Sequence, residues 1–339
     1  MCGIDENGLG PFLGPLIITS VEIQESKNDQ EEKNSNERAP KSKENIIENN
    51  EEIKDSKAIF SRKIEDYEKI EKIFFSIFGK NKNMNFSPPS NIFQVFVKSE
   101  FSNEIVELCP ISPEKICFPE INIPLWMKNS LTQNEKEGNE RKREENGIRQ
   151  EENEIIASKK LSVRYAILCP GLLSKYVRIM GSKFSANSYF MLKMALLSSS
   201  EKVICGKSGF KKSYKNEIEK ALQDLNINYK KIKTEKERNE ESVYEILIEN
   251  EGKEKTLKKI YFIKDADEKF YEVALASKIG KYIREICMLA LTKFLDEKSI
   301  FPISGYGKKE NLKKIAESII QKAYSKEIKI PQECIERNY

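Results

Sequence analysis

The sequence contains no histidine, and no other feature of its composition restricts its chemistry as much. Without histidine, the chain has no Ser-His-Asp or Cys-His nucleophile system, no HExxH metal site and no histidine general base. Any enzymatic chemistry must therefore depend on carboxylates, lysines or a bound metal ion.

Other absences exclude whole classes of protein. No apolar run reaches the roughly 18 to 20 residues of a membrane-spanning helix, and the N-terminus lacks the basic region and apolar core of a secretory signal. We therefore expect an intracellular protein, cytoplasmic or, in a eukaryote, nuclear. The seven cysteines are scattered without a CxxC pair, which argues against a zinc ribbon or a disulfide framework. A Walker A motif and a GxGxxG fingerprint are also missing.

Charge, by contrast, is abundant, at 33% of the 339 residues, with 58 basic and 54 acidic side chains. Residues 24–54 are net negative and residues 128–160 are neutral, and both lack the apolar content needed to offset the entropy of ordering. We predict that both are disordered charged insertions. The basic excess then falls on the remaining chain, which permits a polyanionic partner without requiring one.

The rest of the sequence alternates between strand and helix patterns. Strands are predicted at 1–4, 13–21, 161–169, 202–205, 227–232, 243–248 and 259–264, with further strand-like pieces in 91–123. Helices are predicted at 57–78, 172–177, 187–197, 214–225, 264–295 and 309–324. This order predicts an α/β fold with a central mixed β-sheet flanked by helices. We expect one domain at 1–308 and a C-terminal helical extension at 309–339.

The first fifteen residues, MCGIDENGLGPFLGP, contain the most distinctive chemistry. Asp5 and Glu6 follow a short apolar strand pattern and precede a turn that contains Gly8 and Gly10. Carboxylates placed where a strand meets a glycine turn can face an open surface, as a metal site or a general base requires. Asp, Asn and Gly are also ordinary residues of an exposed hairpin turn. Taken alone, the stretch leaves both interpretations open.

Six segments in consecutive order resemble type 2 ribonucleases H, the family of ribonuclease HII and the catalytic subunit of eukaryotic ribonuclease H2. GIDENGLGPFLGP is similar to the family's GIDEAGRGPxxGP opening, and KDADEKFYEVALASKIGKYIRE is similar to its KADxxxPxVxAASIxAKVxRD segment. The other four are DSK at 55–57, the Asn-containing helix at 185–197, KVICGKSG at 202–209 and SGYG at 304–307. The resemblance implies a ribonuclease H-like fold.

The resemblance also implies a two-metal hydrolase. In this family four carboxylates hold two Mg²⁺ or Mn²⁺ ions, which activate water and stabilise the leaving oxygen. By position, Asp5, Glu6 and Asp267 match three of these catalytic metal ligands. The remaining ligand is expected at position 205, where this chain has Cys205, and a thiol is a poor ligand for Mg²⁺.

A substitute carboxylate is therefore needed, and two residues are candidates. Glu201 stands at the start of the predicted 202–205 strand, and Asp265 lies two residues before Asp267. Asp265 is the stronger candidate. If both aspartates lie on one strand, they share a face but are displaced by ~7 Å.

Substrate contacts follow from the same resemblance. Gly8, Leu9 and Gly10 match the turn that senses the ribose 2′-hydroxyl at an RNA–DNA junction, and Tyr306 matches the tyrosine that acts with it. Leu9 replaces the family's arginine, although the turn's backbone amides can still donate to a hydroxyl. Tyr306 can alternatively be read as a packed turn residue.

Basic residues form an expected phosphate-binding track along this site. Lys57 in DSK and Lys281 and Arg284 in the predicted long helix match basic positions of the family. The lysines at 207, 211, 212 and 215 fit either a phosphate contact or a solvated loop equally well.

Two hypotheses result. The first is a metal-dependent endonuclease that cleaves RNA in RNA–DNA hybrids or ribonucleotides embedded in DNA, with an activity impaired by Cys205 and Leu9. The alternative is a catalytically inactive family member that serves as a nucleic-acid-binding or scaffold protein. Accessory protein subunits, which eukaryotic relatives have, are left open.

Overall fold

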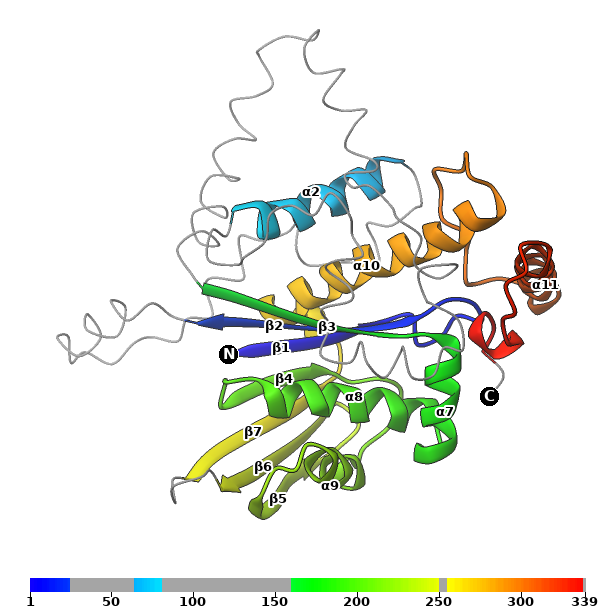
Figure 1. Cartoon of the computed structure of the whole chain (residues 1–339). Coiled ribbons are helices and arrows are strands. Elements are labelled where there is room, and N and C mark those ends of the chain that lie inside the picture. The colour runs from blue at the N-terminus through cyan, green and yellow to red at the C-terminus, as the bar shows by residue number, and fades with distance from the viewer. Residues whose placement is uncertain (25–63, 81–159, 250–254, 338–339) are drawn as a thin grey trace, which may run out of the picture.

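A seven-stranded mixed sheet forms the centre of the protein (Figure 1). The computed structural model describes residues 1–24, 64–80, 160–249 and 255–337. The strands are β1 (Cys2–Asn7), β2 (Leu16–Gln24), β3 (Lys160–Leu168), β4 (Lys202–Gly206), β5 (Tyr229–Glu237), β6 (Glu241–Glu249) and β7 (Lys255–Ile263). The α/β class with a central mixed sheet is thus confirmed. Lys57, the strand-like pieces at 91–123 and all but the end residues of the predicted insertions lie outside the described residues.

The strand order, β3-β2-β1-β4-β7-β6-β5, places three parallel strands in the middle. β1 pairs in parallel with β4, and β4 in parallel with β7, whereas the flanking strands pair antiparallel. The carboxyl ends of parallel strands meet at one edge of a sheet, where α/β proteins commonly bind their ligands. β1, β4 and β7 end there at Asn7, Gly206 and Ile263.

Helices cover both faces of this sheet (Figure 1). On one face α10 packs against β1 and β2 and is itself covered by α2, whereas α7, α8 and α9 lie on the other face. The helices in the described part of the chain are α2 (Ile64–Lys80), α7 (Pro170–Met180), α8 (Lys183–Leu197), α9 (Lys215–Asp224), α10 (Tyr271–Leu295) and α11 (Lys309–Ser325). None of them combines the length and the apolar character needed to span a membrane.

α10 approaches the sheet closely because small residues line the contact. A Cβ atom on Gly3 of β1 would lie 2.4 Å from the backbone of Glu272 and Val273. A Cβ atom on Gly280 of α10 would lie 2.7 Å from Asn7 Nδ2 and 2.8 Å from Thr19 Oγ1. This close packing sets the depth of α10 relative to the end of β1.

The segment 264–295, which we predicted as one helix, is helical only from Tyr271. Asp265 adopts a left-handed backbone conformation with φ 52°, and a short 3-10 turn, η3 (Ala266–Glu268), follows it. The turn places Asp267 at the sheet edge rather than on the helix or on strand β7. The idea that Asp265 and Asp267 share one strand was therefore wrong, because β7 ends at Ile263.

α11 packs onto the end of α10 in an apolar cluster separate from the main core. This cluster joins Leu13, Met288 and Leu291 to Leu312 and Ile319 of α11. The main core fills the space between the sheet and the helices on both faces. The boundary at residue 308 remains a prediction.

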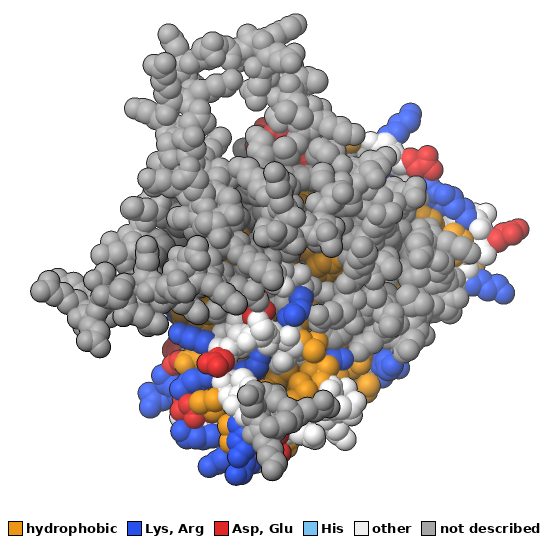
Figure 2. All heavy atoms as spheres, turned by 60° about the vertical axis from the view of Figure 1, so that its left-hand side comes forward, with side chains coloured by type: hydrophobic (Ala, Val, Ile, Leu, Met, Phe, Trp, Pro, Cys, Tyr) orange, Lys and Arg blue, Asp and Glu red, His pale blue; other side chains and the backbone are white. Residues whose placement is uncertain are grey.

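The edge strand β5 and its neighbours carry much of the exposed charge. Lys233 pairs with Glu235 and Glu245, each at 3.2 Å, and Lys259 pairs with Glu245 at 3.1 Å. Figure 2 shows Lys and Arg side chains gathered on the lower part of the molecule, with acidic side chains between them. Charged residues on an edge strand oppose pairing with other chains.

Candidate active site

A cavity of about 480 Å³ opens at the carboxyl ends of β1, β4 and β7. Its lining includes ten of the predicted site residues, namely Asp5, Glu6, Gly8, Leu9, Gly10, Asp265, Asp267, Lys281, Arg284 and Tyr306. The structure therefore brings together, in one place, residues from both ends of the sequence. The simple hairpin-turn interpretation of the N-terminal acids does not account for this convergence.

Asp5 experiences the negative charge of its neighbours. Burial raises the pKa of Asp5 well above its ordinary value, and the charge of Glu6 raises this pKa further. A hydrogen bond with Ser277 of α10 acts in the opposite direction, while the charge of Asp267 adds to the increase. Closely spaced carboxylates of this kind favour either a shared proton or a bound cation.

Glu6 is oriented by a hydrogen-bonded chain that begins on α8. The buried Asn187 donates from Nδ2 to Ser208 Oγ at 3.0 Å, and Ser208 Oγ donates to Glu6 Oε1 at 2.7 Å. The sequence comparison picked out the helix that contains Asn187 but gave neither Asn187 nor Ser208 a role. The one available signal for Ser208 was a polar residue just beyond the end of a buried strand.

The residue of β4 that faces the carboxylates is Gly206 rather than Cys205. Cys205 lies opposite Ile4 in the parallel β1–β4 register, and both side chains are buried in the core. Because side chains alternate along a strand, the next position points to the other face. A Cβ atom on Gly206 would lie 2.6 Å from Asp5 Oδ1 and 3.8 Å from Glu6 Oε2.

The chemistry of Cys205 agrees with this placement. Burial raises the pKa of the Cys205 thiol well above its ordinary value. A neutral thiol within the core is unsuited to metal binding, since the thiolate is the ligand form. At position 206, the absence of a side chain leaves space beside Asp5 and Glu6.

The two candidate substitutes differ in their location. Asp265 lines the cavity, whereas Glu201 precedes β4, at the opposite end of that strand from Gly206. The described residues contain no group of three His, Cys, Asp or Glu side chains arranged to hold a metal ion. Asp5, Glu6 and Asp267 provide the hard oxygen donors that Mg²⁺ and Mn²⁺ prefer, but not a complete, preformed set.

Arg284 is buried beside the glycine turn. Its Nη1 donates to Glu285 Oε1 at 3.5 Å, whereas Nε and Nη2 are buried without a hydrogen-bond partner among the described residues. Cβ atoms on Gly8 and Gly305 would lie 2.4 Å from Nε and 2.8 Å from Nη2, so the two glycines make room for the guanidinium. Buried donors without a partner are costly unless a ligand satisfies them.

Tyr306 lies above this arginine and remains open to solvent. Its ring centroid is 5.7 Å from Arg284 Cζ, and a Cβ atom on Gly10 would lie 3.6 Å from the ring. The side chain is 54% exposed, which is more than a packed turn tyrosine would show. An exposed aromatic ring next to an open cavity can contact a sugar or base.

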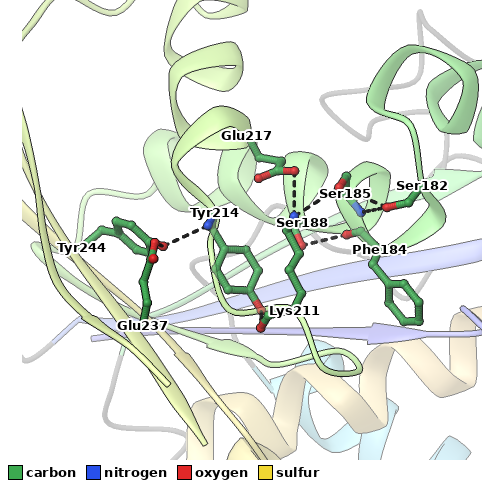
Figure 3. Close-up of polar contacts among 9 residues, drawn as sticks. All are labelled: Ser182, Phe184, Ser185, Ser188, Lys211, Tyr214, Glu217, Glu237 and Tyr244. Atoms are coloured by element: carbon green, nitrogen blue, oxygen red, sulfur yellow. Dashed lines mark hydrogen bonds and ion pairs between the residues drawn. The ribbon is translucent and has the colours of Figure 1, made fainter. Parts of the chain in front are cut away.

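Among the lysines at 207–215, the structure brings Lys207 to the cavity. Lys207 Nζ donates to Arg238 O and, at 2.9 Å, to Ser242 Oγ. Lys211 Nζ pairs with Glu217 at 2.9 Å and contacts Ser185 Oγ at 3.2 Å, as Figure 3 shows. The lysines at 212 and 215 are exposed and do not line the cavity.

The loop between β4 and α9, which carries most of these lysines, is anchored by hydrogen bonds that involve Tyr214 and Tyr244. Tyr214 N donates to Tyr244 OH at 2.9 Å, and Tyr244 OH in turn donates to Glu237 (Figure 3). Ser242 Oγ donates to Lys212 O at 2.6 Å. This network fixes the loop after β4, and with it the position of Ser208 beside Glu6.

The family model of ribonuclease HII matches residues 186–330 of the chain. The resemblance to type 2 ribonucleases H is confirmed. Two solved structures are also similar, the PCNA:RNase HII complex from Archaeoglobus fulgidus (13% identity, TM-score 0.39) and the ribonuclease H2 from Pyrococcus horikoshii OT3 (14% identity, TM-score 0.41). Each alignment covers 98% of this chain and 90% of the other. Among curated proteins, no match is found.

The ribonuclease HII match covers only some of the residues that line the cavity. The matched residues contain Gly206, Asp267 and Tyr306, whereas Asp5 and Glu6 lie far upstream of them. The parallel pairing of β1 with β4 brings the upstream carboxylates to the matched ones. The cavity is therefore continuous in space, although the family match covers only part of its lining.

Proposed function

We propose that the protein is a type 2 ribonuclease H-like endonuclease that hydrolyses RNA in RNA–DNA hybrids or at ribonucleotides embedded in DNA. The observation that carries the proposal is the convergence of Asp5, Glu6 and Asp267 on one cavity, where burial and then the charges of Glu6 and Asp267 raise the pKa of Asp5. When bound, Mg²⁺ or Mn²⁺ would activate water and stabilise the leaving 3′ oxygen. These three carboxylates are the residues that would hold the ions.

The remaining cavity residues bind and orient the substrate in this proposal. Arg284 offers two buried donors that have no hydrogen-bond partner within the described part of the chain, and Lys281 adds a second positive charge, so both suit a phosphate of the nucleic-acid backbone. The amides of the Gly8–Gly10 turn donate to the ribose 2′-hydroxyl, and the exposed ring of Tyr306 packs against the sugar. Lys57, outside the described residues, is assigned to the same phosphate track by resemblance.

Gly206 is the reason to expect weak activity. A carboxylate there would lie beside Asp5 and Glu6 and would complete the set of four. Its absence leaves a bound metal pair with less negative charge and one fewer ligand. Asp265 is the substitute that lines the cavity. Leu9 is expected to lower selectivity for ribose rather than the rate of the chemical step.

The same glycine favours a second candidate function, in which the protein binds hybrid nucleic acid without cleaving it. Binding depends on Arg284, Lys281, Tyr306 and the glycine turn, none of which requires a side chain at position 206. Accessory protein subunits are compatible with either function.

A cleavage assay with Mg²⁺ and Mn²⁺ on a duplex containing one ribonucleotide separates the two functions. We expect weak cleavage by the wild type, none by Asp5→Asn, and an increase of roughly tenfold or more, equivalent to about 1.4 kcal/mol, for Gly206→Asp. The close contact of a Cβ atom at position 206 is with Asp5 Oδ1 at 2.6 Å, the end of a flexible side chain, and Glu6 Oε2 lies at an ordinary 3.8 Å. Cys205→Asp is the matched control, because its carboxylate would enter the core and should lower stability without restoring cleavage.

The possible results are distinct. Binding without cleavage by the wild type, together with cleavage by Gly206→Asp, would establish the inactive binding protein. If the wild type binds the ribonucleotide-containing duplex no better than an all-DNA duplex and cleaves neither, both proposed functions are refuted.

A further inference from the structure

Arg337 clamps the glycine turn of the cavity from the C-terminal end of the described chain. Its side chain is buried and lies beyond residue 330, where the ribonuclease HII match ends. Nη1 donates to Gly8 O at 2.5 Å and to Leu9 O at 3.3 Å. Nε and Nη2 donate to Gly14 O at 3.1 and 2.7 Å. One guanidinium thus spans both ends of the turn.

Backbone contacts reinforce the clamp. Arg337 N donates to Phe12 O at 3.0 Å, and Glu336 forms an antiparallel bridge with Leu13. On the other side, Phe12 N donates to Gly305 O at 2.9 Å in the SGYG turn. The glycine turn is therefore held between the C-terminal segment and the turn that carries Tyr306.

The direction of these bonds determines where the amides of the turn point. In a trans peptide the carbonyl and the following N–H point in opposite directions. Holding the carbonyls of Gly8 and Leu9 on Arg337 therefore directs the N–H groups of Leu9 and Gly10 away from it. Within the described residues these two amides donate no hydrogen bond, and both residues line the cavity.

We propose that Arg337 is a positioning residue for ribose selection, which holds the amides of Leu9 and Gly10 toward the 2′-hydroxyl of the substrate. The inference rests on the proposed function, because it specifies how that site distinguishes ribose from deoxyribose. The family has an arginine within this turn where the chain has Leu9. In this chain the guanidinium of Arg337, from the C-terminal segment, contacts the same turn through the carbonyl oxygens of Gly8 and Leu9.

The test measures how much more tightly each protein binds a ribonucleotide-containing duplex than an all-DNA duplex, and it does not measure cleavage. Full-length wild type, Arg337→Ala and Arg337→Lys are titrated against two labelled duplexes of identical sequence, one with a single ribonucleotide and one all-DNA, with Ca²⁺ replacing Mg²⁺. We expect Arg337→Ala to lose about tenfold in affinity for the ribonucleotide duplex while its affinity for DNA changes less than about twofold. Lysine cannot span three carbonyls and should rescue only partly.

Arg178→Ala is the matched control. Arg178 Nη2 lies 3.5 Å from Glu333 Oε1, so it ties α7 to the same C-terminal segment, in the 3-10 turn η4 (Gln332–Cys334). Its side chain is 70% exposed, and its ion pair is with Glu333 rather than with a residue of the glycine turn. We expect unchanged discrimination in this variant. Added guanidinium ion should restore part of the discrimination in Arg337→Ala and have no effect on the control.

The results separate this inference from the proposed function. If the wild type binds the two duplexes equally and also fails to cleave at the ribonucleotide with Mg²⁺, the proposed function fails; if it cleaves there while binding both equally, the role of Arg337 is overturned. If the wild type does distinguish them, and a folded Arg337→Ala with a normal cooperative melt retains the same ratio of affinities for the two duplexes, the role of Arg337 is overturned. Should the alanine variant not fold, the lysine variant decides: a reduced ratio supports the role, and a wild-type ratio overturns it.

Discussion

At the residue scale, the motif match and the structure differ by one position on β4. Cys205 matched the expected ligand position, yet its side chain is in the core and Gly206 faces the carboxylates. A sequence motif alone does not show which face of the sheet each side chain of a strand points to. The parallel register with β1 decides that, and a shift of one residue reverses every side chain.

Asp5 gives a prediction at this scale, namely a pH-dependent stability. Its raised pKa means that the folded protein holds a proton that the unfolded chain releases near pH 4. Between pH 4 and the raised pKa, the folded state binds more protons, so this contribution to stability is lost as pH rises. We expect Asp5→Asn to become progressively more stable relative to wild type as pH increases in metal-free buffer.

Thermal melts of both proteins across this pH range provide the measurement. Asp265→Asn is the control, since Asp265 is exposed on the same cavity. Its difference from wild type should not follow the Asp5→Asn curve. A difference between wild type and Asp5→Asn that stays constant with pH would contradict the raised pKa of Asp5.

At the scale of elements, the apolar patterns predicted the existence of nearly every strand and helix of the described chain. β4 was recognisable because KVIC is a short apolar run closed by a glycine. The start of α10 was not, because the residues before it look helical while Asp265 turns the backbone left-handed. A left-handed backbone is uncommon for any residue other than glycine, so the local pattern did not indicate this turn.

The contact between β1 and α10 provides a prediction at this scale. In Gly3→Ala the new methyl group would lie 2.4 Å from the backbone of Glu272 and Val273, which cannot rotate away as a side chain can. We expect a loss of about 1 to 3 kcal/mol in the free energy of unfolding, because helix and strand must separate. The shift also moves η3, which carries Asp267, relative to Asp5.

Denaturant unfolding measures this loss, with Gly171→Ala as the control. A Cβ atom at Gly171, in the first turn of α7, would find its nearest neighbour, Glu333 O, at an ordinary 3.6 Å. Alanine also favours helix formation by up to about 1 kcal/mol, so this variant should be no less stable than wild type. Equal stability of the two variants would show that the β1–α10 contact tolerates expansion.

At the scale of the whole molecule, the site is assembled from segments that are far apart in the sequence. β1, the end of β4, η3, the SGYG turn and the C-terminal segment each supply part of it. The motifs could be recognised one by one, and a known family order predicted that they would meet. Arg337 could not be found this way, since no local pattern links it to Gly8, 329 residues earlier.

A site assembled in this way should couple metal binding to global stability. A ligand that binds only the folded state stabilises it by about 2.7 kcal/mol at a concentration of 100 times its Kd. We expect Mn²⁺ to raise the thermal midpoint of the wild type, and to do so more at pH 8 than at pH 5.5, because Asp5 must lose its proton. Gly206→Asp should respond more strongly than wild type, and Asp5→Asn should respond little.

This measurement does not depend on catalysis, so it tests separately whether Gly206 weakens metal binding or the chemical step. A wild type that Mn²⁺ stabilises but that does not cleave would retain metal binding and lack the chemical step. A wild type without a response, beside a responsive Gly206→Asp, would lack the ligand itself. If the wild type and Asp5→Asn respond equally, Mn²⁺ binds elsewhere, and the three carboxylates do not form the metal site of this protein.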